Sequence, residues 1–329
     1  RIHSQYGRSA MIGLGVLYAV LSTFSFSINQ VSVRRGMLAG SAIQGVYVSV
    51  LAGTPILLLI ALATTQLFRV ADLSGTSYAW LAGAGVAHFL FGRYTNYRTV
   101  GALGAIRARP IIQMSFLVSI GFAALWLNEE ITTPMWFGIG LVAVGPMVLY
   151  RGRRRSAPAV TVSAPGQGSP PPVVQAGSLI APPPAKVIEG YFFGSLNAVV
   201  FGLTPLMVRQ GLVDSDGLGV LGALVAYSAA AAVLLPTLAI PAVRQALAGI
   251  DRSSGRWFMS ATMAVLMAQM FHFLALSVAP VSVVMPVQRA GSVFLLPMSF
   301  LINRQTESFE PRVLIAIAIS ITGSLIIVL

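Results

Sequence analysis

An internal repeat constrains the fold of this chain more than any other feature. Residues from about Val100 to Leu149 recur from about Val278 to Ile327 at a constant offset of 178. The pairs that stay in register are Val100/Val278, Phe116/Phe294, Leu117/Leu295, Glu129/Glu307, Ile139/Ile317 and Gly145/Gly323. Because the repeated unit is apolar and holds several segments of membrane length, the repeat predicts a duplicated transmembrane bundle, an arrangement found mostly in carriers.

A second, shorter repeat lies upstream of this one. Val33-Arg34-Arg35-Gly36 in the first half is matched by Val208-Arg209-Gln210-Gly211 in the second. The duplication therefore extends toward the start of each half.

The composition is that of a membrane protein. The chain has 329 residues, of which 56% are hydrophobic and 9% charged, against about 25% charged residues in soluble domains. Apolar windows of about 20 residues recur along nearly the whole sequence. The net charge of +12 comes from basic residues between apolar segments, where orientation signals lie, so it does not indicate nucleic-acid binding. The absence of cysteine excludes disulfides, thiolate metal sites and cysteine catalysis.

The sequence predicts an all-α membrane protein with ten transmembrane helices in two sets of five. The predicted spans are Met11–Val33, Ile43–Phe68, Tyr78–Tyr94, Val100–Trp126, Met135–Tyr150, Gly190–Val208, Leu218–Ile240, Trp257–Ala279, Val281–Ile302 and Val313–Leu329. Hydropathy marks the divisions at Tyr94–Val100 and Ala279–Val281 least clearly. The first apolar segment is longer than the core of a signal peptide, so we expect it to be a retained span.

Three regions follow from this reading: a first five-helix repeat at residues 1–150, a linker at 151–186 and a second five-helix repeat at 187–329. The linker is rich in proline, alanine, serine and glycine, and such a segment predicts a flexible, partly extended tether. An odd number of spans in each half places the two repeats in opposite orientations, which is the inverted topology of many secondary transporters.

The positive-inside rule gives one orientation for this topology. Most basic residues, including Arg93 at the end of the predicted third span and Arg98 in the loop that follows, fall on the face opposite the termini, so the charge count places both termini outside.

Three arginines fall inside predicted spans. Arg107 and Arg109 lie roughly 10–14 Å into the fourth span, and Arg289 lies about as deep in the ninth. Charged groups at that depth are costly and usually face a cavity. All nine carboxylates fall in predicted loops or at span ends, namely Asp72, Glu129, Glu130, Glu189, Asp214, Asp216, Asp251, Glu307 and Glu310. A cavity with arginines and no carboxylate suits an anionic or zwitterionic substrate, whereas arginines that snorkel to the interface are the alternative.

Other intramembrane polar residues extend this candidate site. Gln113 and Gln288 are spaced to share a face with the arginines, and Asn29 and Asn197 complete the predicted substrate-binding set. Hydrogen bonding between helices explains such residues equally well.

Histidine is the side-chain type whose ordinary pKa lies near neutrality, and His88 and His272 fall inside predicted spans, which makes them candidates for proton coupling. A membrane histidine can equally be a neutral hydrogen-bond donor. Pro110 and Pro286 are candidate hinges, because each removes a backbone donor from a span at matching points of the two repeats. A merely bent helix is the alternative reading of both prolines.

No motif of an enzyme is present. The sequence contains no metal-ligand cluster, nucleophile elbow, phosphate loop or carboxylate pair in its apolar part. We therefore expect neither catalysis nor a cofactor or metal.

Two copies of one signature carry a family resemblance over nearly the whole chain. In the first copy, Gly101-Ala102-Leu103-Gly104-Ala105 leads to Pro110, then to Leu127-Asn128-Glu129-Glu130, and then to Gly138, Gly140 and Gly145. In the second, Val278-Ala279-Pro280-Val281-Ser282 leads to Pro286, Glu307 and Gly323. This pattern resembles the EamA-type branch of the drug/metabolite transporter superfamily.

The resemblance implies a ten-helix carrier of small metabolites, with inverted halves around a central cavity. The chain departs from the common pattern in its long linker, in its arginines and in the approach to Glu307. The resemblance also implies cytoplasmic termini, which disagrees with the charge count.

The sequence thus predicts a multi-pass secondary transporter of the bacterial inner membrane. Its partners would be the lipid bilayer and a small-molecule metabolite, moved by alternating access, with no nucleic acid. A flippase for a lipid-linked sugar or phosphate would share the fold and the arginines. A non-transporting scaffold or sensor would instead have a solidly packed centre, and an intramembrane enzyme is the remotest alternative.

Overall fold

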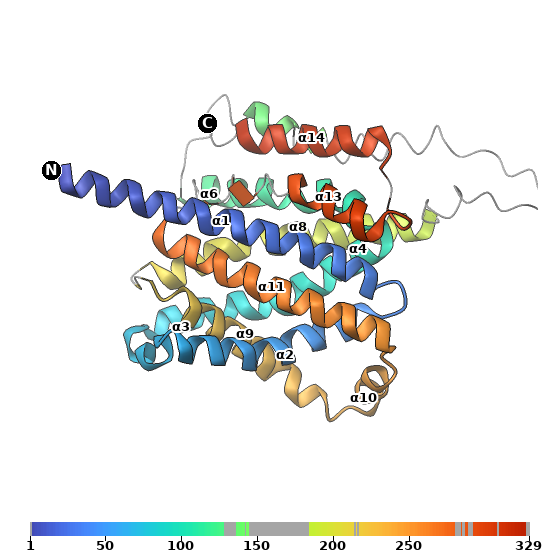
Figure 1. Cartoon of the computed structure of the whole chain (residues 1–329), viewed down its shortest axis with the longest axis horizontal. Helices are drawn as coiled ribbons and strands as arrows, with labels where there is room; N and C mark the ends of the chain where they lie inside the picture. Colours follow the sequence, from blue (N-terminus) through green and yellow to red (C-terminus); the bar gives the residue numbers. More distant parts are fainter. Residues whose placement is uncertain are drawn as a thin grey trace, which may run out of the picture.

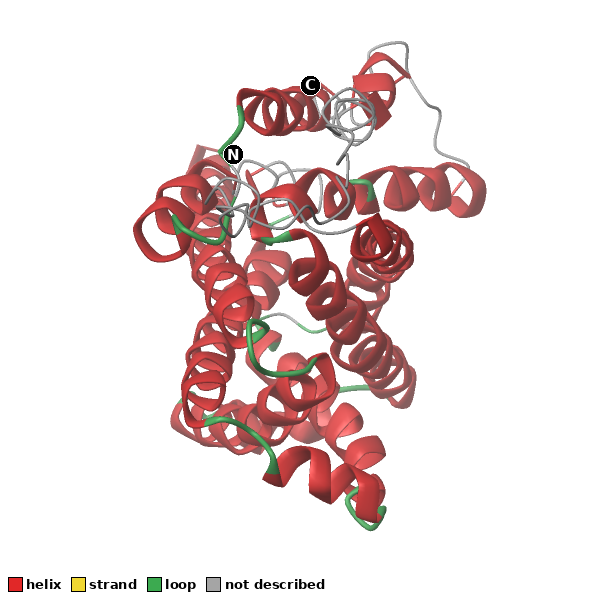
Figure 2. Ribbon diagram, turned by 90° about the vertical axis from the view of Figure 1, so that its right-hand side faces the viewer, coloured by secondary structure: helices red, strands yellow, loops and turns green. Residues whose placement is uncertain are grey.

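The computed structural model describes residues 2–127, 136–141, 143–144, 184–213, 215, 217–279, 284, 287–288, 292–307 and 309–326. Within these ranges the chain is helical and contains no strand. The helices lie side by side with their long axes in a common direction (Figure 1), and several are seen nearly end-on in Figure 2.

The helices of the first half are α1 (Ile2–Gly36), α2 (Ala42–Ala63), the 3₁₀ helix η1 (Gln66–Asp72), α3 (Gly75–Gly85), the π-helix η2 (Val86–Gly92), α4 (Arg93–Leu103), α5 (Ala105–Gln113) and α6 (Ser115–Leu127). Those of the second half are α8 (Pro184–Leu212), α9 (Gly219–Thr237), α10 (Pro241–Ala248), α11 (Arg252–Val278), α13 (Ser292–Asn303) and α14 (Pro311–Ile326).

Five of the described helices are long and apolar enough to cross a membrane, namely Gly13–Gly36, Ala42–Ala63, Ala185–Leu212, Gly219–Thr237 and Arg252–Val278. Large apolar side chains cover the outside of the bundle: Leu59, Phe91, Phe192 and Leu301 are each at least 64% exposed. Such a surface would be an aggregation hazard in water and suits contact with lipid. The chain is therefore a multi-helix membrane protein.

Polar side chains fix where several helices begin. Ser41 and Gln44 form a reciprocal capping box at the start of α2, and the Asp251 carboxylate accepts from the N–H groups of Ser253 and Ser254 at the start of α11. These contacts satisfy backbone donors that the first helical turn leaves without partners.

The two halves interdigitate. α1 packs along α11, α4 along α8, and α3 along α9, so each pair joins one helix from each half. The approach of α3 to α9 is very close, because a Cβ on Gly85 would lie 2.0 Å from the carbonyl oxygen of Ala226. α1 and α8, the first helices of the two halves, run in opposite directions along the bundle (Figure 1).

The predicted break at Tyr94–Val100 is wrong. α3, η2 and α4 form one continuous helical run, and the chain breaks instead at Gly104, where φ is +87°. Positive φ strains any residue with a side chain, so glycine suits this position.

Two smaller boundaries also differ from the prediction. α8 begins at Pro184, so residues 184–186 belong to that helix, while the rest of the predicted linker lies outside the described residues. α10 is an element without a counterpart in the predicted spans, and it forms a short helix between α9 and α11.

Candidate functional site

A polar cavity of about 130 Å³ lies inside the bundle. Helices of both halves contribute to it, including α1, α4 and α5 from the first and α8 and α11 from the second. Its lining residues are Thr23, Phe26, Asn29, Gln30, His88, Arg93, Asn96, Tyr97, Arg109, Ile112, Ser115, Phe201, Pro205, Val265, Gln269, His272 and Gln288.

Arg93 brings a fixed positive charge to this cavity. The residue is only 4% exposed. Its Nη1 donates to the hydroxyl of Ser49 on α2, and its Nη2 donates to the hydroxyl of Tyr227 on α9 at 2.8 Å. The guanidinium carbon also lies 4.8 Å from the ring centroid of Phe89 and 5.2 Å from that of Tyr227. Two neutral hydroxyls and two aromatic faces thus hold the guanidinium.

No described carboxylate lies within ion-pair distance of Arg93. A guanidinium has five N–H donors, and the two contacts with Ser49 and Tyr227 do not exhaust them. A buried cation usually has an anionic partner, because its desolvation costs several kcal/mol. The cavity side of Arg93 is therefore a suitable place for the negative group of a ligand.

Arg109 is the second cationic residue of the cavity lining. It lies in the middle of α5, the short helix that begins after the break at Gly104. Pro110 follows it in the same helix. No aspartate or glutamate occurs among the described residues that line the cavity, so its electrostatic character is positive.

The two predicted histidines both line the cavity, and each is hydrogen-bonded to a glutamine. His88 Nε2 and Gln269 Nε2 are 2.9 Å apart, and His272 Nδ1 and Gln288 Nε2 are 2.7 Å apart. In this arrangement each glutamine amide donates to an unprotonated ring nitrogen. His88 also stacks on Phe201, with ring centroids 4.5 Å apart. A π-helical segment carries His88, and such segments occur frequently at functional sites.

Asn29 and Gln30 of α1 complete the polar wall. Asn29 Nδ2 donates to the carbonyl oxygen of Ala261 at 2.9 Å, and Gln30 Nε2 donates to Asn96 Oδ1 at 3.4 Å. Among the described residues, Gln30 Oε1 and His88 Nδ1 are buried and have no hydrogen-bond partner. Such atoms in a cavity lining are available to water or to a polar ligand.

The cavity thus gathers five of the predicted site residues: Arg109, Gln288, Asn29, His88 and His272. Asn197, Gln113 and Arg107 lie elsewhere. Asn197 is fully buried and donates to the carbonyl oxygen of Gly92 at 2.7 Å, and Gln113 is buried in α5 without lining the cavity. Arg289 and Pro286 lie outside the described residues.

The depth predicted for Arg107 is wrong. Because α5 begins at Ala105 rather than near Val100, Arg107 lies close to the helix end, where its Nη2 is 2.7 Å from Oε1 of the largely exposed Glu310. It is not among the cavity-lining residues.

Sequence reasoning missed Arg93, because it placed this residue at the end of the third span and counted it only as an orientation signal. The signal that could have found it is the absence of proline between Gly75 and Leu103, which allows one helix to continue through the polar stretch after Arg93. Gln30, Asn96 and Gln269 are further polar lining residues outside the predicted set. No group of three or more histidine, aspartate or glutamate side chains able to hold a metal occurs in the described part of the chain.

Comparison with known proteins agrees with this architecture. No curated protein matches the chain. A solved crystal structure of another protein is similar over 97% of this chain and 96% of that chain, with a TM-score of 0.57 and 15% sequence identity. At that identity the likeness shows the fold alone.

The family comparison is more specific. Residues 13–151 match the model of the EamA-like transporter family, a family of membrane transporters of small compounds. The match confirms the resemblance predicted from the sequence motifs, and it covers the first half of the chain up to residue 151.

Proposed function

We propose that this protein is a secondary transporter that moves a small anionic or zwitterionic metabolite across the bacterial inner membrane by alternating access. The family match supports transport of a small compound. The observation that carries the anionic character is Arg93, buried in the cavity lining without a carboxylate partner among the described residues. Arg109 adds a second positive charge to the same lining.

The proposed scaffold is a ten-helix bundle of two inverted five-helix repeats. The opposite directions of α1 and α8 support it. A matched pair of contacts supports it further: Arg34 Nη1 donates to the carbonyl oxygen of Gly101 at 3.0 Å, and Arg209 Nη1 donates to that of Leu276 at 3.2 Å. Each acceptor lies two residues before the end of its helix, α4 or α11. Rocking of two such halves would expose the central cavity to alternate sides.

A transporter fits the centre of the molecule better than a scaffold or sensor does. A scaffold would require a solidly packed centre, whereas the described residues enclose a cavity lined by arginine, histidine, glutamine and asparagine side chains. These groups are expensive to bury, and in a membrane protein such groups usually mark a substrate or ion pathway.

Uptake by liposomes tests this proposal. Purified protein would be reconstituted, and uptake of a panel of labelled carboxylates, phosphates, amino acids and cations would be measured. We expect uptake of at least one anion or zwitterion and a strong loss in Arg109→Gln. Arg69→Gln is the matched control, because Arg69 forms a half-exposed pair with Asp72 away from the cavity. Uptake of cations only, or equal anion uptake by Arg109→Gln and wild type, would contradict the proposal.

A further inference from the structure

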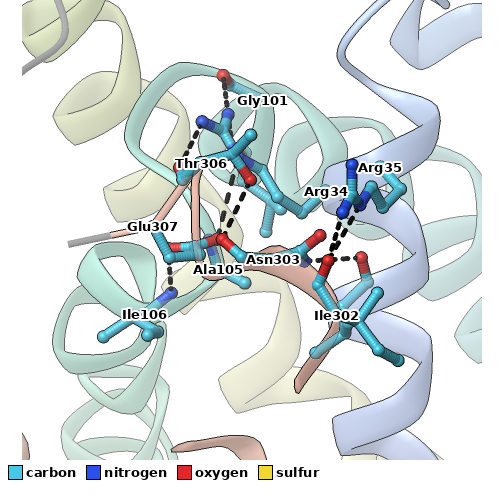
Figure 3. A network of polar contacts seen from close by, with 11 residues as sticks. Arg34, Arg35, Gly101, Ala105, Ile106, Ile302, Asn303, Thr306 and Glu307 are labelled. Atoms are coloured by element: carbon cyan, nitrogen blue, oxygen red, sulfur yellow. Dashed lines mark hydrogen bonds and ion pairs between the residues drawn. The ribbon is translucent and has the colours of Figure 1, made fainter. Parts of the chain in front are cut away.

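A buried glutamate outside the cavity joins the two halves at one end of the bundle. Glu307 lies in the connection between α13 and α14 and is only 3% exposed. Its Oε1 accepts from the backbone N–H of Ala105 at 2.6 Å, and its Oε2 accepts from that of Ile106 at 3.2 Å. These are the first two residues of α5, so the carboxylate caps a helix about 200 residues away in the sequence (Figure 3).

The break at Gly104 creates the need for this cap. α4 ends at Leu103 and α5 begins at Ala105, so the break leaves terminal carbonyls on one helix and terminal N–H groups on the other. A negative charge is favourable at the N-terminus of a helix. The fit is tight, because a Cβ on Gly104 would lie 2.7 Å from Glu307 Oε2.

Arg34 satisfies the other side of the same break. Its Nη1 donates to the carbonyl oxygen of Gly101 near the end of α4, and its Nη2 donates to that of Thr306 at 2.9 Å. Its Nε lies 3.7 Å from Glu307 Oε1. One ion pair between α1 and the α13–α14 connection thus supplies partners to both ends of the broken helix.

Two further contacts close this end of the bundle. Asn303 Nδ2 donates to the carbonyl oxygen of Val31 at 3.0 Å, and the guanidinium of Arg35 donates to that of Ile302. Apart from the bond from Arg34 to Gly101, which lies within the first half, these contacts join α1 or α5 of the first half to α13 and the following connection of the second half. Relative movement of the halves at this end requires that they break.

The capped helix also carries a cavity residue. Arg109 lies one turn beyond Ala105 in α5 and lines the central cavity. Because α5 is a short helix bounded by the break at Gly104, the cap at its first turn determines where the helix sits. Displacement of the cap would therefore move Arg109 as well as open this end.

We propose that Glu307 is the latch that holds this end of the carrier closed, and that it positions Arg109 by capping α5. The inference rests on the proposed transport function, because a closed end matters only in a carrier. The contacts that carry it do not depend on the identity of the substrate.

Thiol labelling of a single introduced cysteine tests the latch without a substrate. The chain contains no cysteine, so Ser115→Cys places one reactive group in the cavity lining. A water-soluble maleimide would be added to purified protein, and the labelling rate compared between Ser115→Cys alone and Ser115→Cys with Glu307→Gln. Glutamine keeps the size of the side chain but directs an amide N–H toward two backbone N–H donors.

We expect Glu307→Gln to raise the labelling rate by about tenfold, as loss of a typical helix cap would allow. Glu307→Asp keeps both carboxylate oxygens and should label at an intermediate rate. Glu310→Gln is the matched control, because this neighbouring carboxylate is largely exposed and pairs with Arg107 at the surface. It should label like the parent.

Equal labelling rates in the parent and in folded Glu307→Gln would overturn the latch. If Glu307→Gln elutes as an aggregate, the labelling rates of Glu307→Asp and Glu310→Gln are compared instead. Equal rates in these two variants would likewise overturn the latch. Liposome uptake separates the two proposals: faster labelling with no uptake of any anion would leave the latch standing and remove the transport assignment. If the Glu307 variants take up the substrate with the wild-type maximal rate and KM, the latch proposal is wrong and the transport proposal is supported.

Discussion

Arg93 and Tyr227 form a direct contact between the two halves of the molecule. The guanidinium Nη2 donates to the Tyr227 hydroxyl at 2.8 Å, while the ring of the same tyrosine lies 5.2 Å from the guanidinium carbon. Arg93 belongs to α4 and Tyr227 to α9, so one half carries the cavity charge and the other half helps to hold it. Movement between the halves would change the surroundings of this charge, which is what an alternating-access carrier requires.

Replacement of Arg93 by glutamine should separate stability from transport. We expect uptake to fall by about 30-fold or more, because a buried charge contact is typically worth about 2–5 kcal/mol. The midpoint of thermal unfolding in detergent should stay level or rise, since the variant no longer buries an uncompensated cation. Arg93→Lys keeps the charge without the planar donor geometry and should show intermediate uptake. A variant that unfolds early and still transports would show that Arg93 is structural.

Gly104→Ala should destabilise the protein for two reasons. The residue has φ +87°, which strains a side chain, and the added Cβ would lie 2.7 Å from Glu307 Oε2. We expect a loss of about 1–3 kcal/mol in the free energy of unfolding. Gly217→Ala is the matched control, because Gly217 has φ +74° but a Cβ added there would have nothing within 4 Å. Thermal unfolding should therefore show a clearly smaller loss for Gly217→Ala. Equal losses would mean that backbone strain alone accounts for the effect.

The sequence predicted the helical membrane architecture but misplaced one helix break. The predicted division at Tyr94–Val100 was only weakly marked by hydropathy, and it fell where the stretch from Arg93 to Arg98 is polar. In the structure Thr95 and Thr99 bond back to the carbonyl oxygens of Phe91 and Thr95, and Arg93 reaches Ser49 and Tyr227. The helix therefore continues, since its polar groups are satisfied inside the bundle.

The candidate site was partly visible in the sequence for a related reason. Ionisable and amide residues within apolar spans led to Arg109, His88 and His272, which the structure places around one cavity. The partners of Arg93 could not be predicted, because they come from α2 and α9, which are distant in sequence. The role of Glu307 was equally hidden: the repeat placed it in register with Glu129, but no pattern within the chain indicates that it caps a helix of the other half.

Glu307 should give the protein a measurable pH dependence of stability. Burial raises the pKa of this carboxyl above its usual value, against the opposing effects of Arg34, the N–H groups of Ala105 and Ile106, and Arg107. A folded-state pKa above the unfolded one, about 4.3, means that the folded state binds the proton more tightly. The stabilisation from this proton is therefore full below the unfolded pKa and is lost as pH rises through the folded pKa.

Glu307→Gln provides the reference for that measurement, because the amide does not titrate. The thermal midpoint of the wild type minus that of the variant should increase as pH is lowered from about 7.5 toward about 4.5. This range lies above the unfolded-state pKa of the carboxyl. A difference that moves the other way would show that Arg34 and the two backbone donors outweigh burial and hold the pKa below its usual value.

The two cavity histidines are predicted to couple transport to protons. His88 bonds to Gln269 and His272 to Gln288, and both rings line the cavity beside the arginines. Histidine is the side chain whose charge changes between about pH 5 and 8 in the absence of other influences. We expect His88→Ala and His272→Ala each to flatten the pH dependence of uptake in that range.

A glutamine at either position distinguishes proton coupling from hydrogen bonding alone. His88→Gln and His272→Gln retain a donor and an acceptor but cannot titrate. If the rings act as proton carriers, these variants should show the same flattened pH profile as the alanine variants. His3→Gln, in the first turn of α1, is the control for the third histidine and should keep the wild-type profile. Glutamine variants with unaltered pH dependence would show that the histidines are neutral partners of Gln269 and Gln288, and the coupling hypothesis would be abandoned.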